Sequence, residues 1–392
     1  MQWSNRAMLN WLIESISDSG GIMKKLRKTK LGELVDFQTG PFGTQFSASE
    51  YVKEGIPVIN VKNIGIGMVV EENLDYISEQ TRDRLSQHIL KTGDIVFGRK
   101  GSVDKHAYIF KNENGWVQGS DCIRARKKTQ VNTLFLSQYL EGDGVKKQII
   151  NAAVGSTMPS LNTDILKDVI VLLPNIKEQN RISEALKKID DKICLNNKIN
   201  DNLEQQMHLI FENMMSKATT HKLPGKYTIA QNLTSVVTGK EDANFSVTNG
   251  KYKFFTCSNT PLLCDDYVFD SSSILIAGNG DFNVKHYSGM FNAYQRTYVL
   301  TPDKKYFALL YLASLYRINS FKSRSSGSIV KFITKSDVEN IPVFIPNDIS
   351  YLQELNKLIY LQEQNKLENE LLIKLRDWLL PMLMNGQATI SD

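Results

Sequence analysis

The sequence carries one passage twice, in the same order and at a constant spacing. Residues 153–186 read AVGSTMPSLNTDILKDVIVLLPNIKEQNRISEAL, and residues 325–358 read SSGSIVKFITKSDVENIPVFIPNDISYLQELNKL. Aligned without a gap, Pro174 falls on Pro346, so the offset between the copies is 172 residues. A repeat of this length limits the possible architectures more than any local pattern does, because each copy belongs to one copy of a larger structural unit.

Each copy of the passage leads into a long helical segment. Residues 175–215 contain no Gly and no Pro, and their Ile and Leu residues recur at intervals of three and four, as they do in 349–380. Apolar residues at this spacing form a stripe along a helix, which must be buried against a partner. We therefore predict that the two helices pair as a coiled coil. The predicted seam consists of Ile182, Leu186, Ile189, Ile193, Ile199, Leu203, Leu358, Leu361, Leu371 and Leu375.

The order of the segments sets the direction in which the helices pair. The first helix, about 40 residues long, carries the chain about 60 Å before the second strand-rich segment begins. The second helix must run back along the first if the two are to pair. This predicts an antiparallel coiled coil with a globular domain at each end, related by a pseudo-twofold axis. The apolar pattern slips in register near Asn196 and Asn197.

Strand-rich segments precede both helices. Residues 93–110 and 271–280 show short apolar runs bounded by Gly, Asn and Asp, which indicates strands and tight turns. The expected fold class is therefore α+β, a tandem repeat of two α/β domains separated by two long helices. The expected organisation is an N-terminal extension over 1–22, a first globular domain over 23–174, a central helix over 175–217, a second globular domain over 218–346 and a C-terminal helix over 347–392.

Composition excludes several classes of protein. The net charge of +5 permits a nucleic-acid partner but requires any basic surface to be local. The four cysteines form no CxxC pair and the five histidines lie far apart, which argues against zinc and disulfides and fits a reducing cytoplasm. No stretch reaches the roughly twenty apolar residues of a membrane span. We interpret residues 1–22 as a short helix ending at Gly20-Gly21, either a docking element or the result of an upstream start before Met23.

Motifs for catalysis are missing from the sequence. It contains no GxxxxGK[ST] phosphate loop, no complete dinucleotide fingerprint, no HExxH and no nucleophile elbow. It also lacks the Asp-Pro-Pro-Tyr or Asn-Pro-Pro-Tyr tetrapeptide with which amino-methyltransferases hold a flipped adenine. We therefore expect no metal site, no cofactor and no catalytic residue in this chain.

Two glycine-bounded turns stand at matching places in the two halves. Residues 97–102 read FGRKGS, and at an offset of 179 residues 276–281 read IAGNGD. Arg99 and Lys100 suit guanine or phosphate, whereas Asn279 suits adenine, so a shared turn with different side chains is what two readers of different bases would need. The alternative is that both turns are solvated hairpin tips.

Other polar residues near these turns are candidates for DNA contacts. Those on the predicted strands 118–128 and 292–300 either face DNA or lie on a merely exposed basic face, and the segment 320–331 is the densest local basic patch. Besides the three turn residues, the candidates are Lys62, Asn63, Ser120, Arg124, Arg126, Gln295, Arg296, Lys322, Arg324 and Lys331.

The sequence resembles the DNA-specificity subunits of type I restriction-modification systems. The resemblance rests on the passage GSTMPSLNTDILKDVIVLLPNIKEQNRISEAL at 155–186, on its copy at 327–358, on LGELVDFQTGPFG at 31–43 and on LLPMLMNGQ at 379–387. It extends over nearly the whole chain from about residue 24. The passage after Gly155 is specific, whereas the interiors of the globular segments contribute little.

The resemblance implies a function and a set of partners. Each globular domain would be a target recognition domain that reads one half of a split, asymmetric site in double-stranded DNA, and the helices would fix the spacing between the halves. Two methyltransferase subunits would hold S-adenosylmethionine and methylate adenine. In the full complex, restriction subunits would use ATP and Mg, translocate and cut. This chain would supply recognition and none of the chemistry.

Three alternatives remain open from the sequence. The chain could be a nuclease or methyltransferase with its own recognition half, which would need a carboxylate cluster or cofactor loop. It could be a coiled-coil adaptor with protein-binding globular domains, whose partner affinity would lack the steep salt dependence of DNA binding. It could also be the specificity subunit of a related restriction enzyme outside type I.

Overall fold

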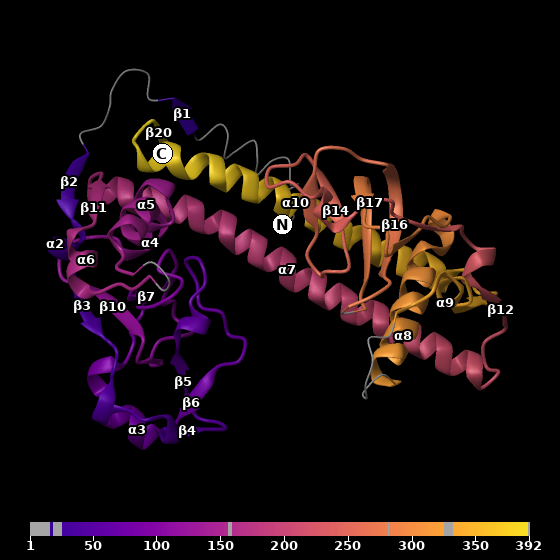
Figure 1. Cartoon of the computed structure of the whole chain (residues 1–392), viewed down its shortest axis with the longest axis horizontal. Coiled ribbons are helices and arrows are strands. Elements are labelled where there is room, and N and C mark those ends of the chain that lie inside the picture. Colours follow the sequence, from indigo (N-terminus) through magenta and orange to yellow (C-terminus); the bar gives the residue numbers. More distant parts are fainter. Residues whose placement is uncertain (1–15, 19–25, 156–158, 281, 325–331, 391–392) are drawn as a thin grey trace. The chain divides into compact units, whose positions relative to one another are not determined.

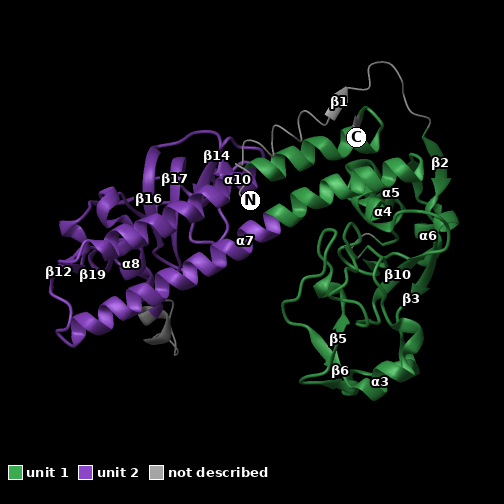
Figure 2. Ribbon diagram, turned by 180° about the vertical axis from the view of Figure 1, so that it is seen from behind, with its two compact units in different colours: residues 1–192, 371–392 green, residues 193–370 purple. Residues whose placement is uncertain are grey.

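The computed structural model describes residues 16–18, 26–155, 159–280, 282–324 and 332–390. The chain forms two compact units, which Figure 2 shows in green and purple. Unit 1 comprises residues 1–192 and 371–392, and unit 2 comprises residues 193–370. Both long helices contribute to both units, because the division falls within each of them.

The main sheet of unit 1 is antiparallel, with the strand order β3-β10-β7-β8 (Figure 1). A second sheet has the order β4-β6-β5-β9, and two-stranded pairs form between β11 and β2 and between β1 and β20. The strands are β1 (Ile16–Asp18), β2 (Arg27–Lys30), β3 (Val35–Thr39), β4 (Tyr51–Val52), β5 (Ile56–Ile59), β6 (Asp75–Ile77), β7 (Ile95–Gly98), β8 (His106–Tyr108), β9 (Val117–Gln118), β10 (Cys122–Lys127), β11 (Ile170–Leu173) and β20 (Ala388–Ile390). The short helices are α2 (Leu31–Leu34), α3 (Glu79–Arg84), α4 (Thr133–Leu140), α5 (Asp143–Ala152) and α6 (Thr163–Asp168).

Unit 2 contains one six-stranded sheet with the order β13-β18-β16-β17-β14-β15, and a separate pair between β12 and β19. The strands are β12 (Gly225–Ile229), β13 (Val236–Thr238), β14 (Tyr252–Phe255), β15 (Leu262–Cys264), β16 (Phe269–Ala277), β17 (Val284–Ala293), β18 (Thr297–Leu300) and β19 (Pro342–Pro346). The helices other than the two long ones are α8 (Phe307–Arg324) and α9 (Lys335–Glu339).

The two units share one sheet topology. The first four strands of the unit 2 sheet are antiparallel neighbours in the same chain order as the four strands of the unit 1 main sheet. Each unit also has one parallel pair, β5 with β9 and β14 with β17. The tandem α+β architecture expected from the repeat is therefore confirmed.

The repeated passage folds in the same way in both units. Asn162 caps α6 by accepting a hydrogen bond from the amide of Ile165, and Thr334, 172 residues later, caps α9 in the same manner. Val171 and Val343 are both fully buried on the strands that follow. Residue 156 and the matching residues 327 and 328 lie outside the described part of the chain.

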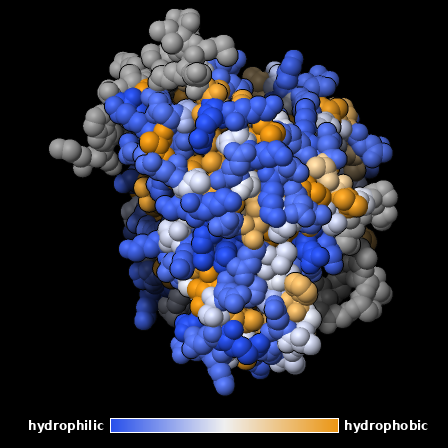
Figure 3. All heavy atoms as spheres, turned by 90° about the vertical axis from the view of Figure 1, so that its left-hand side faces the viewer, coloured by the Kyte–Doolittle hydropathy of each residue, from blue (hydrophilic) through white to orange (hydrophobic). Residues whose placement is uncertain are grey.

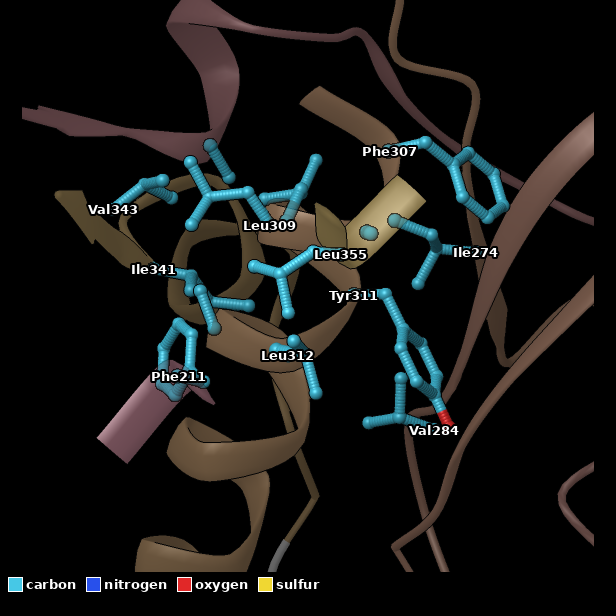
Figure 4. Packing of buried hydrophobic residues seen from close by; sticks show 14 of the residues in the cluster. Phe211, Ile274, Val284, Phe307, Leu309, Tyr311, Leu312, Ile341, Val343 and Leu355 are labelled. Carbon is cyan, nitrogen blue, oxygen red and sulfur yellow. The ribbon is translucent and has the colours of Figure 1, made fainter. Parts of the chain in front are cut away.

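The core of unit 2 joins its sheet to helices α8 and α9 and to both long helices. Figure 4 shows Ile274 from β16 and Leu309 from α8 beside Phe211 and Leu355, which come from the two long helices. These side chains are almost completely buried. Burial of large apolar side chains stabilises a fold by roughly 1.5–3 kcal/mol each, so the long helices are integral parts of unit 2.

The two long helices are α7 (Ile176–Thr219) and α10 (Ser350–Met384). Within unit 2 they run antiparallel, since Asn196 bonds to Asn369, Asn200 to Asn365 and Lys217 to Tyr351. Within unit 1, Arg376 of α10 donates to Asp190 of α7 at 3.2 Å. The predicted antiparallel pairing is confirmed in the part of each helix that unit 2 contains.

Of the residues in the predicted apolar seam, those toward its ends are buried or half-buried, and those in the middle are exposed. Ile182, Leu186, Ile189, Leu203 and Leu358 are buried, and Ile193 and Leu375 are half-buried. Ile199, Leu361 and Leu371 are 39%, 40% and 47% exposed and do not belong to the seam. A buried polar layer lies between the helices in unit 2 instead. It consists of Asn196, Asn200, Gln362, Glu368 and Asn369.

The polar layer is held by amide hydrogen bonds between the helices. Asn196 Nδ2 donates to Glu368 Oε2 at 2.8 Å and to Asn369 Oδ1 at 2.9 Å. Asn369 Nδ2 donates in turn to Asn197 Oδ1 at 2.8 Å. Buried polar groups are tolerated when they satisfy one another in this way, and they favour one register of a helix pair over others. The slip near Asn196 is thus the place where polar contacts replace apolar ones.

We expect Asn196→Asp to destabilise unit 2 in a pH-dependent manner. The new carboxylate would lie against Glu368 in a buried layer, where like charges oppose each other, and the expected loss is about 3 kcal/mol at pH 8. Protonation at pH 5 should remove much of this loss. Hydrogen exchange of residues 193–219 in urea at both pH values measures it. Asn202→Asp, at an exposed position on the same helix, should behave like the wild type.

One further prediction concerns the N-terminal segment of the chain. Residues 16–18 form strand β1, paired with β20, so the helix predicted over 1–22 is wrong for these three residues; residues 1–15 and 19–22 lie outside the described part.

On the face seen in Figure 3, hydrophilic residues dominate and apolar ones form small groups. Among the described residues, no helix is both long and apolar enough to cross a membrane.

Candidate nucleic-acid interface

The strand ends of the unit 1 main sheet bring three polar segments together at one edge. At this edge β3 and β7 end and β10 begins, and main-chain bonds join the segments that follow or precede them. The amide of Gly40 donates to the carbonyl of Cys122, and the amide of Arg99 donates to the carbonyl of Asp121, both at 2.8 Å. We call these segments, residues 40–46, 99–105 and 119–121, the loop edge of unit 1.

The loop edge of unit 2 is built with the same bonds. It comprises residues 239–242, 278–280 and 294–296, which flank β13, β16 and β18. The amide of Gly239 donates to the carbonyl of Thr297 at 3.1 Å, and the amide of Gly278 donates to the carbonyl of Arg296 at 2.8 Å. The matching turns predicted from the 179-residue offset thus occupy equivalent positions in the two sheets.

The repeated passage fixes the key turn in each unit. The amide of Leu161 donates to the carbonyl of Arg99 at 2.8 Å, and the amide of Ile333 donates to the carbonyl of Gly278 at 2.8 Å. Leu161 and Ile333 are separated by the repeat offset of 172 residues. The duplicated segment therefore supports the loop edge with its main chain and leaves the side chains of the turn free to differ.

A Thr-Gly pair ends the first strand of each main sheet, and the glycine is required by close packing. A Cβ atom on Gly40 would lie 1.9 Å from the carbonyl oxygen of Gly119, and one on Gly239 would lie 1.9 Å from that of Ala293. Glycine in such a strand end marks the close approach of another backbone. This equivalence was not predicted from the sequence, although both strand ends read Thr-Gly, at Thr39-Gly40 and Thr238-Gly239.

Two cations of the turn 97–102 lie on the loop edge of unit 1. Arg99 is half-buried, and its side chain makes no hydrogen bond or ion pair with any described residue. Lys100 is exposed and its Nζ lies 3.6 Å from Asp121, a loose ion pair between two half-exposed side chains. Surface pairs of this kind contribute little to stability, so both cations are available to a phosphate or to a guanine edge. Ser120 beside them is half-buried.

The loop edge of unit 2 presents a different set of groups. Asn279 is half-buried, and Arg296 is exposed; neither side chain has a hydrogen-bond partner among the described residues. Gln295 is exposed and donates to Asp242 Oδ1 at 2.8 Å. One residue that sequence analysis did not select is Lys285, which is half-buried and donates to the carbonyls of Thr256 and Ser258. Burial lowers the pKa of Lys285.

Two of the predicted contact residues, Asn63 and Arg124, lie in the interior of unit 1, and for them the prediction is wrong. Asn63 is fully buried and donates to the carbonyls of Val70 and Glu72. Arg124 is 7% exposed, its Nη1 donates to the carbonyl of Gln87 at 2.8 Å, and burial lowers its pKa. These groups hold loops to the sheet and cannot reach a DNA partner.

Arg126 is half-buried, with 29% of its side chain exposed, and is held by an ion pair. Its Nε and Nη2 bond to the two carboxylate oxygens of Asp94 at 2.8 and 2.6 Å, and Asp94 is 2% exposed. The strand β10 lies in the middle of its sheet with the segment 87–89 over the face that carries Arg124 and Arg126. Both faces of β10 are therefore covered by other segments, so alternate residues of this strand do not form a solvated set.

The remaining candidates differ in how far the structure describes them. Lys62 is exposed and forms an ion pair of 2.8 Å with Asp75. Lys322 and Arg324 end α8, but their side chains lie outside the described part, as does the whole of Lys331. Among the described residues, no group of three or more His, Cys, Asp or Glu side chains is arranged to hold a metal ion.

Comparison with known proteins shows to which family this chain belongs. Residues 23–205 and 228–376 match the type I restriction modification DNA specificity domain. The chain therefore belongs to this family, with two copies of the domain, and the resemblance found in the repeated passage is confirmed.

Individual relatives agree with this family. The chain is 35% identical over 164 residues to the Type I restriction enzyme EcoDI specificity subunit of Escherichia coli, a match that covers 40% of this chain and 37% of that subunit. It is 25% identical over 202 residues to the Type I restriction enzyme MjaVIII specificity subunit of Methanocaldococcus jannaschii, covering 48% and 45%. The matches thus span less than half of these curated relatives.

A solved structure supports the fold. The crystal structure of the type I restriction-modification system S subunit from M. genitalium superimposes with a TM-score of 0.60 at 17% sequence identity, and the match covers 94% of this chain and 98% of that one. At this identity the likeness concerns the fold alone, and it extends over the whole tandem arrangement.

Proposed function

We propose that this chain is the sequence-recognition subunit of a type I restriction-modification enzyme. Each unit reads one half of a split, asymmetric target in double-stranded DNA, and the paired helices fix the spacing of the halves. The globular domains are residues 23–174 and 218–346, and the spacer helices run through 175–217 and 347–392. The chain recognises the target sequence, and its partner subunits carry out catalysis.

One observation carries the proposal: the two loop edges have the same main-chain frame and different side chains. The bonds of Gly40 and Arg99 in unit 1 recur at Gly239 and Gly278 in unit 2. Within this frame, Lys100 occupies the place of Asn279. Lysine suits guanine and phosphate, and asparagine suits adenine, so a duplicated frame with unlike side chains fits two readers of different half-sites.

The proposed contact residues are those that the structure leaves on the loop edges. Free cations supply the salt-dependent attraction to phosphates, and amide and hydroxyl groups supply the discrimination between bases. The set consists of Arg99, Lys100, Ser120, Asn279, Gln295 and Arg296, with Lys62, Lys322, Arg324 and Lys331 as candidates nearby in the sequence or beyond the described side chains.

Partner docking is proposed for the outward faces of the long helices. In unit 2, Leu209, Tyr360 and Leu367 are more than half exposed, and in unit 1 Trp378 is 54% exposed. Exposed apolar residues on a helix favour contact with other helices. The partners are two methyltransferase subunits that carry S-adenosylmethionine, joined in the full complex by restriction subunits that use ATP and Mg.

A map of adenine methylation tests the proposal. DNA from cells that express this chain with its adjacent methyltransferase is compared with DNA from cells that lack only this chain. We expect a two-part motif with a fixed gap that disappears with the chain. An unchanged map, with the methyltransferase shown to be active, would reject the proposal and favour an adaptor role for the helices.

We expect the double variant Arg99→Ala, Lys100→Ala to weaken DNA binding in a salt-dependent manner. Each phosphate contact contributes about −0.9 to the slope of log K against log salt, so the slope should become shallower by about 1 to 2. Titration of the assembled methyltransferase with a labelled target at several salt concentrations measures this. Lys111→Ala, at an exposed position after β8 on the opposite edge of the sheet, should leave the slope unchanged.

A further inference from the structure

Unit 1 contains a pocket that the proposed function does not use. It lies between the turn that joins α4 to α5 and the last turns of α10, and its volume is about 610 Å³. Ile66, Leu380 and Met384 line one part of it, and Glu141 and Asp377 line another. A pocket with an apolar wall and a few converging polar groups is the usual form of a small-ligand site.

The Glu141 carboxylate is the distinctive group of the pocket. It is half-buried, and it makes no hydrogen bond or ion pair with any residue of the described ranges. Its Oε1 packs over Gly67, where any side chain would overlap it. Burial, with a second contribution from Asp190, raises the pKa of Glu141 to about 7. A carboxylate in such a position gains from a cationic partner.

The charges around the pocket leave an acidic excess. Arg376 donates to Asp190 at 3.2 Å and to Asp377 at 3.1 and 3.2 Å, so that two carboxylates already balance its charge. The remaining charged groups of the lining are Glu141, Asp143 and Lys146, and Arg376 and Lys146 both act to lower the pKa of Glu141, less strongly than burial and Asp190 raise it. The excess favours a positively charged ligand over an anion, although α5 begins at the pocket.

We propose that this pocket binds an aliphatic ammonium ion, that is, a primary amine on a short apolar chain. The methylene groups pack against Ile66, Leu380 and Met384, and the ammonium group bonds to Glu141, in the way that lysine side chains bury their stems and keep the charged end paired. The ligand is either a free polyamine or a lysine side chain of a partner. The inference does not depend on DNA recognition.

Calorimetric titration of the full chain with putrescine and with n-butylamine tests the proposal. At pH 8 we expect both amines to bind and n-butanol, which has the same shape without the charge, not to bind. Binding should be about tenfold weaker at pH 6, because only about a tenth of Glu141 is then ionised. Amine binding that is equal at both pH values, or no binding at all, would overturn the proposal.

Two variants separate binding from folding. Glu141→Gln should weaken amine binding at least tenfold, whereas Glu54→Gln, at an exposed position in the β4–β5 turn, should bind like the wild type. The raised pKa of Glu141 means that the wild-type fold loses stability as the pH rises through about 7. Glu141→Gln should therefore unfold at a higher temperature than the wild type at pH 8. The same thermal unfolding measurement would identify a variant that does not fold. Equal amine binding by Glu141→Gln and the wild type would overturn the proposal.

The assembled methyltransferase distinguishes the two sources of the amine. If putrescine still binds to the complex, the ligand is a free polyamine. If the complex excludes putrescine and Glu141→Gln weakens assembly, the ligand is a lysine of the partner. Either result supports the ammonium site, and neither requires the target of the DNA proposal to be known.

Discussion

Gly239→Ala is expected to destabilise the loop edge of unit 2 by about 3 kcal/mol or more and to abolish methylation of the gapped target. The added Cβ would lie 1.9 Å from the carbonyl oxygen of Ala293, so β13 must move away from the adjoining segment. Overpacking against a rigid backbone is among the costliest single substitutions. Hydrogen exchange of the two units and methylation of a plasmid that carries the target measure the two effects.

The reciprocal variant provides the control. Gly40→Ala places a Cβ 1.9 Å from the carbonyl oxygen of Gly119 and should lower protection in unit 1 only, as Gly239→Ala does in unit 2 only. Gly144→Ala has open space around the new methyl group and lies in α5, so it should stabilise unit 1 slightly. Equal loss of protection in both units by either loop-edge variant would contradict the independence of the frames.

Asp94→Ala is expected to destabilise unit 1 by about 3 to 5 kcal/mol. Asp94 is almost fully buried, binds both Arg126 nitrogens named above and accepts a bond from the amide of Lys91. Its removal leaves the Arg126 charge unpaired beside Arg124, and removing one partner of a buried pair costs this much. Chemical unfolding followed by hydrogen exchange of β10 measures the loss.

Asp36→Ala is the matched control for Asp94→Ala. Asp36 lies on the neighbouring strand β3 and pairs with Lys128 at 3.3 Å, but its side chain is largely exposed. Exposed pairs contribute about 0 to 1 kcal/mol, so this variant should remain close to the wild type. A similar loss of stability in both variants would show that burial does not increase the contribution of the Asp94 pair to the free energy of unfolding.

The repeat predicted much of the fold because it constrains long-range order. The 172-residue offset placed Leu161 and Ile333 in matching positions, and both amides bond to the turn that each unit uses. The same offset aligned the caps Asn162 and Thr334. The two copies of the repeated sequence can be aligned without knowing which elements pack together.

The errors arose where one-dimensional patterns cannot show what covers a side chain. Spacing by three and four placed Ile199 in the seam, but Asn196, which donates to Asn369 across the pair, takes the buried position instead. Arg124 on the predicted strand 118–128 was expected on an exposed face, but segment 87–89 covers that face. Both outcomes depend on partners that are distant in the sequence.

The loop edges are held by main-chain bonds, so their folding does not depend on the identity of the side chains they present. Under the proposed function, substitutions at positions such as Lys100 or Asn279 change the address with little cost in stability. The repeated passage also offers the same bond donors, Leu161 and Ile333, to whichever turn precedes it. In evolutionary terms, and under the proposed function, a lineage can acquire new targets by small steps at these turns, and its descendants inherit an intact fold.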